Sequence, residues 1–207
     1  MKKPFRITAK HIFWFKALLH TVAFSWLFIT YFQAFSDNLG ADPVKAILHF
    51  TGIGAFNLLL ISLCITPVAK TFRQGQLINL RRPIGLYAFC YALCHFISFL
   101  IFELQLQWSL IFSELTKRPY ISVGFIALLI LTALAVTSTK SIQKSMGSIW
   151  QKLHNWVYLA SLLVALHYIW SVKTLQLQPV LYGLIVFILL ATRKSKFTRY
   201  LKRRKAN

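Results

Sequence analysis

Residues 83–102 read PIGLYAFCYALCHFISFLIF, a predominantly apolar run with one histidine, His95, in its second half. About 20 apolar residues form an α-helix long enough to cross the hydrocarbon core of a bilayer. Such runs recur along the chain, which has 207 residues, of which 57% are hydrophobic and 14% charged. The sequence therefore predicts an all-α fold, a polytopic membrane helix bundle.

The apolar runs predict one integral membrane domain that covers residues 1–207. The second run carries Gly52 and Gly54, which permit close helix contact, and we expect it to end before Pro67. Pro83 and Pro119 are expected to open the third and fourth helices, because a proline in the first turn leaves no backbone bond unmade. The six expected spans are 12–32, 47–66, 83–102, 119–138, 152–171 and 178–192.

Basic residues concentrate on one side of the expected spans. The formal net charge is +20, and the N-terminus, the loops 67–82 and 139–152, and the C-terminal tail hold 19 of the 24 Lys and Arg residues. The positive-inside rule therefore places both termini in the cytoplasm and explains the charge without nucleic acid. We expect the basic tail to contact anionic membrane lipid. All four acidic residues lie on the opposite side: Asp37, Asp42, Glu103 and Glu114.

Two histidines fall at similar depth on different expected helices. His95 follows Pro83 by 12 residues, or roughly 18 Å along a helix, and His167 follows Lys152 by 15 residues, or roughly 22 Å. A histidine inside a membrane span is costly and indicates a function. Facing imidazoles at matched depth can ligate a haem iron from both sides. We therefore predict that His95 and His167 are axial haem ligands.

Small residues precede His95 on one face of its expected helix. Gly85, Ala88 and Ala92 lie ten, seven and three residues before it. They would leave clearance for a flat porphyrin, or they would serve close helix packing. The sequence leaves both explanations open.

His154 lies 13 residues before His167 in the fifth expected span, a spacing that suggests a second haem. Two observations limit this hypothesis. Thirteen residues leave the two side chains roughly 140° apart around an ideal helix. The third helix has Arg81 and Arg82 where a second ligand would lie. Binding of another cofactor, a proton relay and an interfacial hydrogen bond remain alternatives for His154.

Three arginines are candidates to bind the acidic groups of a cofactor, such as haem propionates or a flavin phosphate. The positive-inside rule also accounts for Arg81 and Arg82. It does not account for Arg118, which with Lys117 lies on the side that is poor in positive charge. That pair would meet outward-directed propionates, dock an acidic partner, or extend to the interface as ordinary snorkelling residues.

Four motifs resemble those of the MsrQ family. They are NLRRPIGLY at 79–87 with His95 shortly after, KRPYISVG at 117–124, WQKLHNWVY at 150–158, and LHY at 166–168. The resemblance covers nearly the whole chain. The family's histidine positions fall on His95, His154 and His167.

The resemblance implies a function. The MsrQ family comprises haem-binding membrane subunits of a bacterial methionine sulfoxide reductase system, within the ferric-reductase-like transmembrane group. The resemblance to this family implies that the chain lies in the inner membrane. It also implies that the chain receives electrons from the quinone pool or a cytoplasmic flavin reductase. The implied cofactors are haem b, one or two, and FMN. The implied acceptor is the periplasmic molybdopterin enzyme MsrP, which repairs oxidised proteins, so that the substrate chemistry occurs on the partner.

Two other functions are consistent with the same residues. A stand-alone ferric or quinone reductase would hold the same haem without a periplasmic enzyme. A transporter or proton channel would use the histidines as a relay, although only Glu103 and Glu114 could join that path.

Overall fold

The computed structural model describes residues 6–172 and 176–193, and this part of the chain is helical without strands. The described part begins with two helices of 27 and 29 residues and ends with two of 15 residues each. In order, the elements are α1 (Ala9–Phe35), α2 (Pro43–Thr71), the 3-10 helix η1 (Gly75–Leu80), α3 (Arg81–Ser98), the π-helix η2 (Phe99–Glu103), α4 (Trp108–Lys117), α5 (Pro119–Val136), α6 (Lys140–Met146), α7 (Ser148–His154), α8 (Val157–Ser171) and α9 (Leu177–Ala191).

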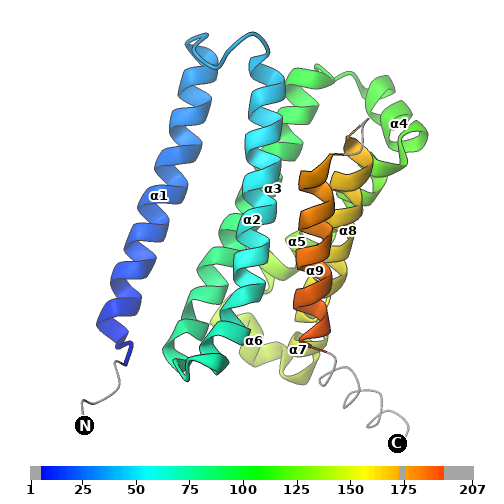
Figure 1. The fold of residues 1–207 in the computed structure, drawn as a ribbon. Coiled ribbons are helices and arrows are strands. Elements are labelled where there is room, and N and C mark those ends of the chain that lie inside the picture. The colour runs from blue at the N-terminus through cyan, green and yellow to red at the C-terminus, as the bar shows by residue number, and fades with distance from the viewer. Residues whose placement is uncertain (1–5, 173–175, 194–207) are drawn as a thin grey trace, which may run out of the picture.

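The long helices lie side by side in a bundle (Figure 1). The helices α2 and α3 form a closely packed pair, α5 packs on α8, and α8 packs on α9. The helix α1 lies at the edge of the bundle opposite to α8 and α9, and most of its apolar surface is exposed. Between α2, α3, α5 and α8 the core contains Leu59, Ala88, Leu131 and Ala160. A helix bundle surrounded by lipid exposes apolar surface of the kind seen on α1. The expected polytopic membrane fold is therefore confirmed.

Four helical segments in the described residues are long and apolar enough to cross a membrane: α1, α2, the continuous segment Gly75–Glu103, and α5. The other two apolar helices, α8 and α9, have 15 residues each. The structure divides the fifth expected span, 152–171, between α7 and α8, which are separated at Asn155 and Trp156. His154 and His167 therefore lie on different helices, so the angle expected from one continuous helix does not apply.

The expected end of the second helix before Pro67 is wrong, because α2 continues to Thr71. Proline lacks the N–H that would bond to the carbonyl four residues earlier, here that of Leu63. Nη2 of Arg193, just after α9, donates to this carbonyl at 3.0 Å, and Nη1 donates to the Tyr158 hydroxyl at 3.2 Å. Arg193 is buried, and it replaces the backbone donor that Pro67 removes.

The helix starts agree with expectation more closely. Pro119 is the first residue of α5, as predicted, whereas α3 begins at Arg81, two residues before Pro83. The apolar runs of the sequence did not predict α4, which has ten residues and is too short to span a bilayer. It lies at the end of the bundle opposite to α6 and α7 (Figure 1).

Candidate haem-binding site

His95 is oriented by α2. Its Nδ1 lies 2.9 Å from the carbonyl oxygen of Leu48. Since a carbonyl only accepts hydrogen bonds, Nδ1 carries the proton and Nε2 keeps its lone pair. Gly52, one turn after Leu48, lies directly against the ring: a Cβ at this position would be 3.0 Å from Cε1 of His95. A side chain at Gly52 would therefore require the imidazole to shift by a few tenths of an ångström.

His167, on α8, is oriented in the same way by α5. Its Nδ1 lies 2.7 Å from the carbonyl oxygen of Tyr120, so this nitrogen also donates and Nε2 is again the unprotonated atom. A Cβ on Gly124 would approach Nδ1 of His167 to 2.6 Å. Real Cβ atoms essentially never make such contacts, so His167 also requires a glycine on the facing helix.

The two imidazoles meet inside the bundle. Their ring centroids are 6.3 Å apart and their planes are inclined by 84°. A metal–imidazole bond is about 2 Å long, so two axial imidazoles on one iron have centroids roughly 6 Å apart. Metal-binding histidines commonly donate the other ring N–H to a backbone carbonyl, which fixes the tautomer and the ring orientation. The donors, their tautomers and their separation all fit a haem iron.

The pair lies toward the end of the bundle that carries the acidic residues. Leu48 is in the second turn of α2, and Tyr120 is the second residue of α5. Both helices begin at the same end as α4 (Figure 1). His95 and His167 therefore lie at similar depth in the bundle, as the sequence predicted, and this allows the two rings to meet.

His154 lies apart from this pair, in a different environment. Its Nε2 is 3.1 Å from Oγ1 of Thr137, whose hydroxyl donates to the Ala133 carbonyl at 2.7 Å. The ring stacks on Trp150 with 3.9 Å between centroids, and Trp150 Nε1 donates to the Thr137 carbonyl at 2.8 Å. Because the Thr137 hydroxyl already donates its proton, His154 donates from Nε2, which leaves Nδ1 as its unprotonated nitrogen.

The small residues before His95 pack against α2. Gly85 faces Ser62, where an added Cβ would be 3.7 Å from Oγ, and Ala88 is buried in the core beside Leu59. Ala92 packs against the same core. Of the two explanations for this stripe, the structure favours helix packing over clearance for a porphyrin.

The arginines that the sequence singled out lie in three different places. Arg118 bonds to Glu114 at 2.8 Å and donates at 3.2 Å to the hydroxyl of Tyr120, the residue whose carbonyl orients His167. The Tyr120 hydroxyl and the Glu114 carboxylate both raise the pKa of Arg118. Arg81 has a buried Nε without a partner among the described residues. Arg82 is exposed and lines a groove between α1 and α3.

Comparison with known proteins places the chain in a family. The model of the family "Ferric reductase like transmembrane component" matches residues 51–165, from α2 to α8. Three curated relatives are each called "Protein-methionine-sulfoxide reductase heme-binding subunit MsrQ". The relative from Cronobacter sakazakii is 45% identical over 196 residues, that from Salmonella arizonae 44% over 196, and that from Pectobacterium atrosepticum 46% over 199. Each alignment covers 94% of this chain and 98% of the relative. The chain belongs to the MsrQ family. No solved structure matches it.

Sequence reasoning identified both imidazoles of this MsrQ-family chain but not the groups that orient them. The carbonyls of Leu48 and Tyr120 have no sequence signal, because every residue has one. Gly124 did give a signal, since a glycine inside a helix costs about 1 kcal/mol relative to alanine and then usually has a packing reason. Gly52 was expected to permit helix contact, and its contact is the ring of His95.

Proposed function

We propose that this chain is the membrane haem-binding, electron-transfer subunit of a methionine sulfoxide reductase system. One haem b would be bound between α3 and α8, with His95 and His167 as its axial ligands. The observation that carries this proposal is the pair of imidazoles, 6.3 Å apart, with each Nδ1 on a backbone carbonyl and each Nε2 available for iron. The names of the curated relatives support it.

The residues of the chain hold the ligands in place. The bound haem would supply one-electron redox chemistry. The Leu48 and Tyr120 carbonyls keep each imidazole in the tautomer that binds iron, and Gly52 and Gly124 give the rings their space. A second haem at His154 stays a prediction, because α3 offers no second histidine there. FMN is proposed from the family resemblance.

We further propose that electrons move from the basic end of the bundle to the acidic end. The donor would be the quinone pool or a cytoplasmic flavin reductase, and the acceptor a periplasmic molybdopterin reductase, MsrP. The charge distribution supports this direction, because the positive-inside rule favours cytoplasmic termini, and the family resemblance implies a bacterial inner membrane. The histidine pair then lies toward the periplasm, where Arg118 and Lys117 would face outward-directed propionates or an acidic partner.

The test is a dithionite-reduced minus air-oxidised visible spectrum of the detergent-purified protein. We expect sharp low-spin haem b bands that disappear in His95→Ala and in His167→Ala. His49→Ala, at an exposed position, is the matched control and should keep them. A wild-type protein without haem, after expression with ample haem, would overturn the proposal and favour the relay transporter.

The proposed partner has a separate test. We expect a soluble molybdenum protein to co-purify with the haem-loaded chain when both are produced together. Haem-loaded protein that reduces ferric chelates or quinones and retains no such partner would instead indicate a stand-alone reductase.

A further inference from the structure

Two grooves run along the contact between the helices α1 and α3. The first, of about 440 Å³, is lined on α1 by Lys16 and His20 and on α3 by residues that include Arg82 and Tyr87. The second, of about 460 Å³, is lined almost entirely by apolar side chains, among them those of Phe24 and Phe28. We call the two grooves together the α1–α3 seam.

The two grooves follow one another along the same faces of the two helices. On α1, a row at four-residue spacing runs from Lys16 through His20 and Phe24 to Phe28, and passes from the first groove to the second. On α3, Cys90 lines the first groove and Cys94, one turn later, lines the second. Side chains four residues apart lie above one another on a helix. The α1–α3 seam is therefore polar and basic at one end and apolar at the other.

The basic end of the seam has positive charge without an internal counter-ion. The lining residues of the first groove include Lys16 and Arg82 but no carboxylate. All four acidic residues of the chain lie in 37–42 or 103–114, toward the opposite end of the bundle. Within the described residues, the side chains of Lys16 and Arg82 make no hydrogen bond or ion pair, and the one ion pair found joins Arg118 and Glu114.

The remaining polar groups of the first groove satisfy each other. Nδ1 of His20 and the Tyr87 hydroxyl are 2.8 Å apart, and their rings are in contact with centroids 5.4 Å apart. A neutral polar headgroup would have to compete with this bond. An anionic group would instead meet two unpaired cations, so the charge of the groove favours an anion.

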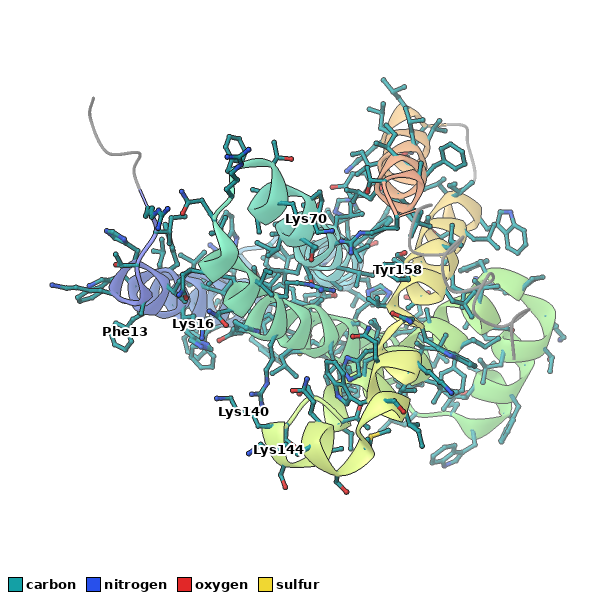
Figure 2. The ribbon with its side chains drawn as sticks, turned by 90° about the horizontal axis from the view of Figure 1, so that it is seen from below. Phe13, Lys16, Lys70, Lys140, Lys144 and Tyr158 are labelled. Carbon is teal, nitrogen blue, oxygen red and sulfur yellow. The ribbon has the colours of Figure 1, made fainter. Side chains whose placement is uncertain are left out.

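The location of the groove indicates the source of the anion. The basic end of the seam lies at the same end of the bundle as α6, and Figure 2, which looks onto that end, labels Lys16 on α1 and Lys140 and Lys144 on α6. The positive-inside rule puts this end at the cytoplasmic leaflet, where anionic lipids interact with basic pockets between helices. Lys16, two turns inside α1, can extend its amine toward the headgroup level while its stem stays in apolar surroundings.

We propose that the α1–α3 seam binds an anionic phospholipid. The phosphate lies between Lys16 and Arg82, and one acyl chain follows the second groove past Phe24 and Phe28. The lipid would lie along the outer side of the contact between α1 and α3. The proposal is independent of the haem site, because Lys16, Arg82, Phe24 and Phe28 are not the residues that orient His95 and His167.

Native mass spectrometry of the delipidated, haem-loaded protein tests this proposal with two lipids that have the same acyl chains, phosphatidylglycerol and phosphatidylcholine. We expect wild type to retain phosphatidylglycerol about tenfold better. The Lys16→Gln/Arg82→Gln variant should lose the preference. The control Lys140→Gln/Lys144→Gln removes two exposed charges from the same end outside the seam and should keep it. The haem spectrum of each variant reports whether it is folded.

Three results would overturn the proposal: no preference in wild type, an equal loss in both charge variants, or displacement of phosphatidylglycerol by a neutral prenylquinone.

A second variant tests the path of the acyl chain. Cys90→Trp fills an exposed position between the two grooves without changing charge. We expect it to lower retention of both lipids with the haem spectrum unchanged. Unchanged retention would place the acyl chain outside the seam and contradict the proposal.

Discussion

His167 and His154 lie at opposite ends of the bundle, and their rings are held in opposite ways. His167 donates from Nδ1 to a backbone carbonyl and keeps Nε2 free, with a glycine behind the ring. His154 donates from Nε2 to the Thr137 hydroxyl and stacks on Trp150. The ring nitrogen available to a metal is set by the bond that the other nitrogen makes. Whether a histidine in a membrane helix bundle can bind a metal thus depends on the atom that its other nitrogen bonds to and on the space behind its ring.

The largest effect on haem binding is expected when a side chain fills the space beside an imidazole. Gly124→Ala would put a Cβ 2.6 Å from Nδ1 of His167, and Gly52→Ala would put one 3.0 Å from His95. Both changes should displace an imidazole, so we expect haem content to fall severely in Gly124→Ala and less in Gly52→Ala. Gly85→Ala is the matched control, since its Cβ would be 3.7 Å from Ser62 Oγ. Pyridine haemochrome assays measure the order, and equal haem in all three variants would contradict the role of the glycines.

The next effect concerns Arg193 at the basic end. Arg193→Gln removes the donor to the Leu63 carbonyl, and an unsatisfied buried carbonyl costs about 1–3 kcal/mol. We expect a lower melting temperature by fluorescence in detergent. Pro67→Ala restores the backbone N–H that can bond to that carbonyl, so the double variant should be less destabilised than the two single changes predict. Additive effects would show that Arg193 acts on something other than this carbonyl.

A smaller effect is expected at His154. Thr137→Val removes the hydroxyl that accepts from Nε2, at a cost of about 1 kcal/mol for one hydrogen bond. The spectrum of the haem that we propose at His95 and His167 should not change, because His154 lies apart from that pair. His154→Ala should likewise reduce haem content less than His167→Ala. A complete loss of haem in Thr137→Val would contradict the separation of the two regions.

The smallest effect is expected at Arg118. In its ion pair with Glu114 the Arg118 side chain is 54% exposed, and an ion pair with a solvent-exposed member contributes little to stability. The pKa of Arg118 is raised, so any stabilising effect is complete below the normal arginine pKa and is lost only as the pH rises through the raised value. We therefore expect Arg118→Gln to leave the melting temperature nearly unchanged from pH 6 to pH 9. A large loss within that range would show that Arg118 has a structural role beyond this pair.

The sequence was a good guide to the spans and a poor guide to what lies between them. Apolar runs predicted α1, α2, α3 and α5, because the bilayer demands a minimum apolar length. The break between α7 and α8 follows no apolar signal, since Trp156 and Val157 continue the run. The continuation of α2 through Pro67 depends on Arg193, which is distant in sequence and appeared only as the start of a basic tail.

The amino-acid sequence by itself determined that this is a membrane helix bundle, which end is basic, and which two histidines lie at equal depth. These properties follow from length, hydropathy and charge, which act on each segment separately. Only the tertiary structure decided which ring nitrogen stays unprotonated, because a tautomer depends on a carbonyl of another helix. It also decided that the space beside each ring comes from Gly52 and Gly124 and not from the small residues of α3. Such contacts arise when helices pack, and no single segment specifies them.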